Sequence, residues 1–304
     1  MPSPSGDQYL LEHGDQRAVV VELGGGVRSY EAGGRPILDG YPLSEPCAGG
    51  RGQVLAPWPN RVGDGRWRWD GVERQLALTE PAAGNAIHGL VRWVPWRRES
   101  ASPRRVRLTH RCHPQPGWSW IVDLALEYRL GDEGLTVALE AINRSGEPCP
   151  FAVGFHPYLA AFGGPVDDAV LRLPAASWYE ADGRGLPVGR HRVDGGPLDF
   201  RDGRAVGAAV LDTALGDLGR DDAGRVEVVL EAGDGSDRTS LWMDGAFTHV
   251  MLFTGDTLAD TRRRRRGLAV EPMTAPVDAL RSGEGLVVLH TDEVFRASWG
   301  VRPG

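Results

Sequence analysis

The stretch Val122-Asp-Leu-Ala-Leu-Glu-Tyr-Arg-Leu130 alternates large apolar residues with small or charged ones, and Leu135-Thr-Val-Ala-Leu-Glu-Ala141 repeats the alternation after Gly-Asp-Glu-Gly. A period of two places successive side chains on opposite faces of a β-strand. Two such runs joined by a short segment bounded by glycines are typical of a hairpin. Residues 119–142 are therefore predicted to form two antiparallel strands, each with one buried and one wetter face.

The same period recurs along the chain. Residues 226–231 alternate in this way, and residues 238–253 are expected to form another hairpin around Asp244-Gly245. Shorter strands are expected at residues 18–23, 66–69, 75–78, 105–110 and 286–290. Helical signals are limited to about one turn each at Asp278–Ser282 and Ala208–Leu215. The glycine-rich residues 183–207 and the arginine run 262–266 are expected to be surface loops, the run being solvated rather than a nucleic-acid site.

Glycine and proline break the chain into many short elements, with 42 glycines and 22 prolines. Many strands, few helices and frequent turns favour an all-β fold, built as a large antiparallel sandwich or barrel. With 304 residues and 41% hydrophobic content, the chain can bury a sizeable core. No shift in composition marks an internal boundary, so residues 1–304 are predicted to form a single domain.

Charge and cysteine content exclude several classes of function. Lys and Arg total 34 against 41 Asp and Glu, a net charge of −7 that gives no counterion-release advantage on nucleic acid. Cys47, Cys112 and Cys149 form no CxxC pair, so neither a disulfide framework nor a zinc site is expected. His110 and His113 flank Cys112 on one strand, which is a weak metal signal. No signal peptide or membrane-length apolar run is seen, so a soluble cytoplasmic protein is expected.

Three segments carry groups that could hold a polar ligand. Asn60-Arg61 lies between a Pro-rich stretch and a Gly-Asp-Gly turn, where a guanidinium fork could bind hydroxyl groups, although a surface arginine fits equally well. His88-Gly89 lies just before an expected strand at residues 90–96, and a structural histidine is the alternative. Asp212 follows an apolar stretch and could accept hydrogen bonds from hydroxyl groups, or could be a cap or turn aspartate.

Two further segments could supply an acid and a base. His156 follows the apolar run Phe151–Phe155 and precedes Pro157, so its imidazole is expected to be largely buried and tuned to titrate near neutral pH. Its alternative role is a core histidine bonded to a carbonyl. Glu271 is expected to end an apolar strand before Pro272, where partial burial raises its pKa. The alternative is an edge-strand glutamate in solvent.

The order of these motifs resembles the aldose 1-epimerase (galactose mutarotase) family from about Trp58 to Asp278. The matching motifs are Asn60-Arg61, His88-Gly89, His156-Pro157-Tyr158, Asp212 and Glu271-Pro272. The Trp-Pro-Asn-Arg and Ile-His-Gly-Leu-Val-Arg segments are most similar to the bacterial branch that includes sulfoquinovose mutarotase-like proteins. Leu159 departs from the family, since many relatives carry an aromatic residue after His-Pro-Tyr.

This resemblance implies a galactose mutarotase-like supersandwich with an open sugar cleft, and a cofactor-independent isomerase acting on a monosaccharide. It implies Glu271 as base and His156 as acid, with Arg61, His88, Asp212 and Asn60 binding the sugar and no metal. A carboxylate and an imidazole suffice to open and reclose a pyranose ring, each contributing about 10²–10⁴-fold. A tryptophan face could stack on the sugar, but ten tryptophans leave the choice open.

Other functions agree less well with the sequence. Leu23-Gly-Gly-Gly26 lacks the context of a nucleotide-binding loop, and Glu271 has no second acidic motif with which to form a glycosidase pair. A non-catalytic sugar sensor on the same fold remains an alternative. So does a mutarotase for a phosphorylated or sulfonated hexose, to whose cationic cluster Arg92, Arg97 and Arg98 could contribute. The sequence fixes neither the sugar nor the choice between monomer and homodimer.

Overall fold

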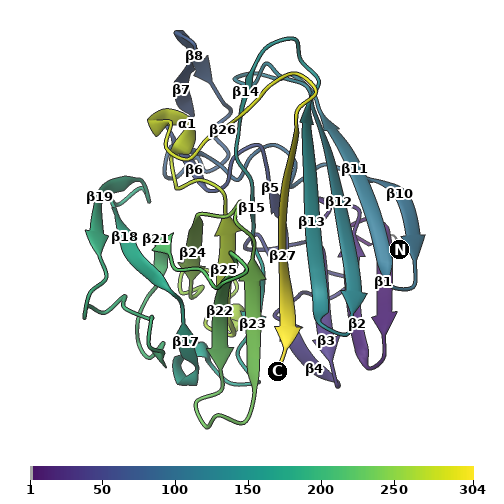
Figure 1. The fold of residues 1–304 in the computed structure, drawn as a ribbon, viewed down its shortest axis with the longest axis vertical. Helices are drawn as coiled ribbons and strands as arrows, with labels where there is room; N and C mark the ends of the chain where they lie inside the picture. The colour runs from purple at the N-terminus through teal and green to yellow at the C-terminus, as the bar shows by residue number, and fades with distance from the viewer. Residues whose placement is uncertain (1–2) are drawn as a thin grey trace.

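Two large antiparallel sheets make up most of the computed structural model, which describes residues 3–304 (Figure 1). Ten strands of the twelve-stranded sheet follow one another in the order β1 (Gln8–His13), β2 (Gln16–Val21), β3 (Val27–Ala32), β4 (Arg35–Leu38), β16 (Tyr158–Ala160), β25 (Gly267–Met273), β24 (His249–Phe253), β21 (Asp212–Leu218), β18 (Ala175–Ala181) and β19 (Pro187–Arg192). The other two, β5 (Val54–Leu55) and β15 (Gly154–Phe155), pair with each other, and β15 also pairs with β25.

The second sheet has nine strands in the order β10 (Arg97–Ser102), β11 (Arg105–Cys112), β12 (Val122–Gly131), β13 (Gly134–Asn143), β27 (Val294–Pro303), β23 (Arg238–Met243), β22 (Val226–Glu231), β17 (Val170–Arg172) and β20 (Arg204–Ala205). Three short pairs lie apart: β6 (Arg61–Gly63) with β9 (Asn85–Ile87), β7 (Arg66–Trp69) with β8 (Val72–Gln75), and β14 (Cys149–Phe151) with β26 (Val287–Leu289). Within residues 3–304, helix is limited to α1 (Ala279–Ser282) and the 3₁₀ turns Val166–Asp168 and Thr261–Arg263, and none of it is long enough to cross a membrane. The predicted all-β fold is confirmed.

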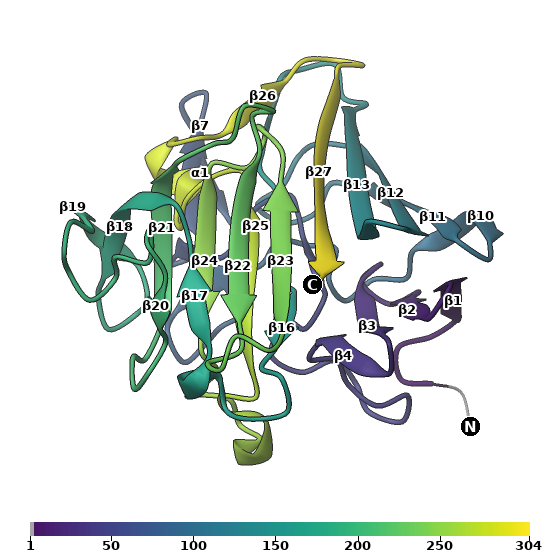
Figure 2. The ribbon, with the colours of Figure 1, turned by 60° about the horizontal axis from the view of Figure 1, so that its bottom comes forward.

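The two sheets pack face to face and enclose the core. Strands β11 to β13 lie over β1 to β3, and β22 and β23 lie over β24 and β25 (Figure 2). Tyr128 of β12 donates its hydroxyl to the carbonyl of Gly25 at 2.6 Å, which joins the nine-stranded sheet to the turn between β2 and β3. Trp299 of β27 packs on Phe155 of β15, with ring centroids 5.3 Å apart. Contacts of this kind make the two sheets into a sandwich.

The predicted hairpin at residues 119–142 is confirmed by β12 and β13, which pair along their whole length from Val122↔Asn143 to Gly131↔Gly134. The apolar positions of β12 point into the core, as Leu124 and Leu126 do, while Asp123 and Glu127 stay partly exposed. Each fully buried leucine contributes about 1.5–3 kcal/mol. The alternation of apolar and polar residues in the sequence therefore corresponds to the buried and exposed faces of the strand.

Several expected elements differ from the structure. The predicted hairpin at residues 238–253 is wrong, because β23 belongs to the nine-stranded sheet and β24 to the twelve-stranded one. Residues 208–215 are not helical, since Asp212 begins β21. Residues 183–207 include two edge strands, β19 and β20. The expected strand at 75–78 lies mostly beyond β8, which ends at Gln75. For β23, β24 and β21, pairing with strands distant in sequence decided the outcome, which the local pattern does not record.

The segment from β5 to residue 96 is folded back against the large sheet and builds one wall of a cleft. Pairing of β6 with β9 places Arg61 opposite Ile87. The backbone N–H of Asp278, just before α1, donates to the carbonyl of Arg61 at 2.9 Å, and the Asp278 side chain accepts from the N–H of Gly63 at 2.9 Å. This segment is therefore anchored at both ends of β6, and the residues it carries have fixed positions.

Candidate functional site

A cleft of roughly 330 Å³ lies at the middle of the twelve-stranded sheet, between its strands and the segment around β6 and β9. Its lining includes all six residues that the sequence singled out: Asn60, Arg61, His88, His156, Asp212 and Glu271. They come from five separate parts of the chain. Pairing of β25 with β24 and of β24 with β21 places Glu271 and Asp212 on strands that are separated by β24 alone.

His156 and Glu271 contact each other at the floor of this cleft. Nε2 of His156 lies 3.2 Å from Oε1 of Glu271, and the two residues are only 5% and 2% exposed. Glu271 lies within β25, which continues through Pro272 to Met273, so the expectation that it ends a strand is wrong. A central strand gives the carboxylate a more rigid position than a strand end would.

The imidazole of His156 is held by close packing. Its backbone N–H donates to the carbonyl of Gln53 at 3.1 Å, and its ring stacks on Tyr158 at 5.1 Å. Gly50 lies against the ring with φ +74, and a Cβ there would come within 2.5 Å of the imidazole. Glycine is needed at this position for both backbone and steric reasons. The sequence reasoning missed Gly50, although the Gly49-Gly50 pair is a signal of close approach.

Burial shifts both members of the pair toward their neutral forms. Desolvation, with smaller contributions from the charges of Arg51 and Arg92, lowers the pKa of His156 from 6.5 to about 3. Desolvation also raises the pKa of Glu271 well above 4.5, and the charge of Asp212 adds to this. The expectation that His156 titrates near neutral pH is therefore wrong for the cleft without a ligand, because the imidazole is more deeply enclosed than the sequence suggested.

Each member of the pair also keeps one polar atom without a partner. Nδ1 of His156 and Oε2 of Glu271 are buried and accept or donate no hydrogen bond among residues 3–304. Buried polar atoms are normally paired, and leaving one unpaired costs about 1–3 kcal/mol. Such atoms at the floor of a cleft are typical of a site that completes its hydrogen bonds with a ligand.

Arg61 projects into the cleft with its guanidinium held by a carboxylate. Nε and one terminal nitrogen donate to Glu80 at 3.0 and 3.1 Å, and the guanidinium lies 3.8 Å from the carboxylate of Asp212. Asn85 is fully buried and donates to Glu80 at 2.8 Å. Glu80 was not singled out from the sequence, because one acidic residue in a loop carries no recognisable spacing.

His88 presents a defined tautomer. The backbone N–H of Asn60 donates to its Nδ1 at 3.2 Å, and burial lowers the pKa of His88 well below 6.5. A neutral ring that accepts at Nδ1 carries its proton on Nε2, so His88 is a hydrogen-bond donor toward the cleft. His88 follows β9 rather than preceding a strand as expected, since residues 90–96 form no strand.

Asn60 shapes the loop as well as lining the cleft. Its side-chain oxygen accepts from the N–H of Arg61 at 2.9 Å, and its backbone is left-handed at φ 53. Asparagine tolerates this conformation and satisfies the turn by itself. Among the ten tryptophans, Trp93 is the one that lines the cleft, with half of its surface exposed.

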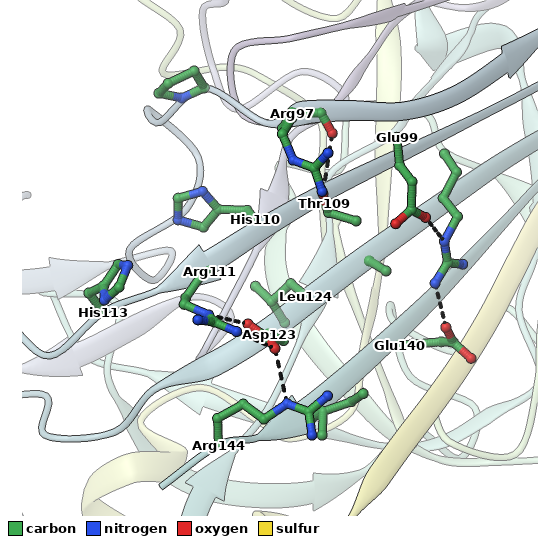
Figure 3. Close-up of a pocket in the computed structure, with 14 residues that line it drawn as sticks. Arg97, Glu99, Thr109, His110, Arg111, His113, Asp123, Leu124, Glu140 and Arg144 are labelled. Carbon is green, nitrogen blue, oxygen red and sulfur yellow. Dashed lines mark hydrogen bonds and ion pairs between the residues drawn. The ribbon is translucent and has the colours of Figure 1, made fainter. Parts of the chain in front are cut away.

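A larger hollow lies on the outer face of the nine-stranded sheet, with a volume of about 700 Å³. Figure 3 shows its side chains, which are mostly paired with one another. Asp123 accepts from Arg111 at 2.6 Å and Arg144 at 3.0 Å, and Glu140 accepts from Arg107 at 2.7 Å. No group of three His, Cys, Asp or Glu residues arranged to hold a metal occurs in the part of the chain that the structure describes. Glu99 is also paired with Arg107, so all three carboxylates that line this groove are bonded to arginines.

Comparison with known proteins identifies the family of this chain. The family model for aldose 1-epimerase matches residues 7–302. The chain belongs to the aldose 1-epimerase family. The uncharacterized protein YihR of Escherichia coli K12 is 30% identical to it over 301 residues, covering 98% of this chain and 93% of YihR.

Solved structures of aldose 1-epimerase homologues share the fold. A putative aldose 1-epimerase from Escherichia coli K12 superposes with a TM-score of 0.83 at 19% identity, covering 98% of this chain and 99% of the other. Galactose 1-epimerase from Lactobacillus acidophilus NCFM superposes with a TM-score of 0.78 at 21% identity, with coverage of 97% and 94%. A GalM/aldose epimerase homologue from C. elegans gives 0.86 at 15% identity, covering 98% of each chain. The galactose mutarotase-like architecture expected from the resemblance is thereby confirmed, and family membership supports an epimerase-type activity.

Proposed function

We propose that this protein is a mutarotase that interconverts the α and β anomers of a hexose by acid–base ring opening and reclosure, with no cofactor. The observation that carries this proposal is the 3.2 Å contact between His156 and Glu271 at the floor of a cleft large enough for a monosaccharide. Anomer exchange needs proton transfers at two neighbouring atoms of the sugar, and an adjacent carboxylate and imidazole offer both.

The reaction assigns one role to each side chain. The Glu271 carboxylate takes the proton from the C1 hydroxyl, the C1–O5 bond breaks as C1=O forms, and His156 gives a proton to O5. Rotation about C1–C2 presents the other face of the aldehyde, and the same transfers in reverse close the ring. The pair is returned unchanged, so the proton balance closes over one turnover.

This chemistry requires the pair to hold one proton in total. Because burial disfavours charge on both groups, that proton rests on Glu271, as the raised pKa of Glu271 and the lowered pKa of His156 indicate. Transfer of this proton to His156 gives the catalytically competent state, a carboxylate beside an imidazolium, in which each charge stabilises the other. Hydrogen bonds from sugar hydroxyls to the Glu271 carboxylate favour that state further.

The remaining groups orient the sugar. The Nε2–H of His88 and the guanidinium of Arg61 are donors, and Asp212 is an acceptor at the cleft wall. Such groups lower the barrier by fixing the sugar in a reactive pose. Trp93 offers an aromatic face for the apolar side of a pyranose. The same proposal treats residues 1–304 as one unit that acts on a monosaccharide in the cytoplasm, as a monomer or homodimer.

Exchange spectroscopy on the purified protein tests the proposal. With a chelator present, wild type is expected to speed the exchange of anomer NMR signals of at least one aldose above the buffer rate. Glu271→Gln keeps the shape of the side chain but removes the base, and is expected to lower the enzymatic rate by at least ~10²-fold. Wild-type rates equal to buffer for all aldoses in a broad panel, together with saturable sugar binding, would replace the enzyme by a sugar sensor.

A further inference from the structure

The ring of Tyr158 contacts both the imidazole of His156 and a buried guanidinium. The two rings are stacked, with centroids 5.1 Å apart and planes inclined by 11°. The guanidinium carbon of Arg51 lies 4.3 Å from the centroid of the Tyr158 ring, and the Tyr158 hydroxyl donates to the carbonyl of Gly49 at 2.7 Å. A movement of Arg51 would therefore displace the ring on which His156 packs.

Arg51 itself is fixed by an ion pair away from solvent. Its Nε and one terminal nitrogen donate to the carboxylate of Asp39 at 3.2 and 2.9 Å, and its side chain is 2% exposed. The backbone N–H of Asp39 donates to the carbonyl of Tyr158 at 2.9 Å. A buried ion pair adds little net stability, because desolvation offsets the attraction between the charges. Stability alone therefore does not account for this pair beside the site.

The charges around His156 differ in how they reach it. The titratable and charged side chains that face its ring come from four parts of the chain: Glu271 of β25, Tyr158 of β16, His88 and Arg92 after β9, and Arg51 before β5. After desolvation, the charges of Arg51 and then of Arg92 lower the pKa of His156. Arg92 packs on Trp93, whereas Arg51 packs on the ring that supports His156.

We propose that Arg51 is a positioning residue that acts on the proposed acid through Tyr158, holding the imidazole of His156 in place and promoting the release of its proton. This inference rests on the proposed mutarotase function, because that function gives His156 a proton to donate. An aromatic face attracts a nearby cation, and Arg51 already occupies this interaction with Tyr158. The ring therefore offers less stabilisation to an imidazolium at His156.

The reaction gains from a cation at this place. An imidazolium that opens the sugar ring must donate its proton to the ring oxygen, which is a weak base. A like charge nearby raises the energy of the imidazolium but leaves the neutral imidazole unaffected, so it favours the transfer. Asp39 offsets part of the charge of Arg51 and so limits the effect.

The test compares two variants that break the same ion pair and change the local charge in opposite ways. Arg51→Gln removes the cation, so the acid–base pair should bind a second proton more readily. The acid limb of the pH profile of kcat/KM and the midpoint of the His156 NMR titration should both move to higher pH, by about 0.5–1 unit. Asp39→Asn keeps the cation and removes its counter-charge, so both should move to lower pH.

Two further variants separate charge from shape. Arg51→Lys keeps the charge and should keep a midpoint close to that of wild type. Arg107→Gln removes an arginine that is paired with Glu99 and Glu140 in the groove of Figure 3, and should leave the midpoint unchanged. Circular dichroism at each pH restricts the comparison to folded protein. If Arg51→Gln does not fold, the direction of the shift in Asp39→Asn decides.

The outcomes separate this inference from the mutarotase proposal. Shifts in the same direction in Arg51→Gln and Asp39→Asn overturn the role of charge, since loss of the ion pair would then explain both. A shift in Arg51→Lys as large as that in Arg51→Gln also overturns it. Turnover with an unshifted midpoint in Arg51→Gln overturns the role of Arg51 and leaves the mutarotase intact. Opposite shifts of the NMR midpoint in a protein without turnover support the effect of Arg51 on His156 and count against the mutarotase alone.

Discussion

The cleft on the twelve-stranded sheet and the groove on the nine-stranded sheet treat charge in opposite ways. In the groove, pairing with arginines lowers the pKa of Asp123 and Glu140, so both carboxylates are stabilised as anions. In the cleft, desolvation raises the pKa of Glu271 and lowers the pKa of His156, so burial favours the neutral form of both groups. The groove has twice the volume, yet each of its lining carboxylates is paired with an arginine. The difference teaches that unmet polar groups, rather than the size of a hollow, indicate where a ligand binds.

The largest effect expected from this contrast is on catalysis. His156→Asn removes the proposed acid of the cleft and should lower the anomer exchange rate by ~10²–10⁴-fold. His110→Asn removes a half-buried imidazole that lines the groove and should leave the rate unchanged. Polarimetry of a freshly dissolved anomer gives both rates. Equal losses of exchange rate in the two variants would contradict the assignment of catalysis to the cleft rather than the groove.

The next largest effect is expected on the free energy of unfolding. Replacing a buried glutamate in the cleft should raise it at neutral pH, whereas replacing a paired glutamate in the groove should lower it. Folding raises the pKa of Glu271 above 4.5, so the folded state holds this proton more tightly than the unfolded chain. The associated stability is complete below pH 4.5 and is lost as pH rises toward the folded pKa. Glu271→Gln avoids this loss, and above pH 4.5 should gain stability over wild type by about 1.4 kcal/mol for each pKa unit of the shift.

Glu140→Gln is the matched control, because folding lowers the pKa of Glu140 through its bonds to Arg107 and Arg296. Its stability contribution is present above pH 4.5 and disappears as pH falls through the folded pKa. The variant should therefore be less stable than wild type at pH 7, by up to ~1 kcal/mol. Urea unfolding at pH 4, 5.5 and 7 measures both variants, and a destabilised Glu271→Gln at pH 7 would contradict the desolvation argument.

A third comparison concerns arginines held by carboxylates. Glu80→Gln weakens the clamp on Arg61 and should lower kcat/KM by about 10-fold, the worth of one charge-assisted bond. Glu99→Gln weakens a similar clamp on Arg107 in the groove and should have no effect on turnover. If Glu80→Gln is as active as wild type, the sugar is oriented without help from Arg61.

The smallest effect is expected within the groove. Asp123→Asn weakens two ion pairs, with Arg111 and Arg144, whose side chains are substantially exposed. Such pairs contribute up to ~1 kcal/mol and are screened by salt. The destabilisation measured in low salt should shrink in 0.5 M salt while activity stays at the wild-type level. A loss of turnover in this variant would show that the groove takes part in function.

The fold was predictable to the extent that pairing is local. β12 and β13 are joined by a tight turn, so the period of two and the glycines sufficed to predict them. The segment 238–253 has a similar pattern, with Asp244-Gly245 between two apolar runs, yet its strands enter different sheets. Sequence patterns record burial and turns but not which distant strand becomes the neighbour. The prediction that residues 1–304 form one domain stays a prediction.

The candidate site was predictable as a set of residue types in a fixed order, through resemblance to a family. The roles given to Glu271, His156, Arg61, His88, Asp212 and Asn60 stay predictions, although the structure brings all six to one cleft. The sequence did not reveal residues whose role depends on a contact with another site residue. Gly50 and Glu80 gain meaning only beside His156 and Arg61, to which they come by folding.

By itself the sequence determined the β architecture, because alternation along a strand is a local property, and it determined which side chains with acid–base chemistry were present. The tertiary structure alone decided that His156 and Glu271 lie 3.2 Å apart, and that burial lowers the pKa of His156 and raises that of Glu271. Each of these depends on strands and loops from distant parts of the chain enclosing the same few atoms, and solvation and charge balance are set by that enclosure rather than by neighbours in sequence.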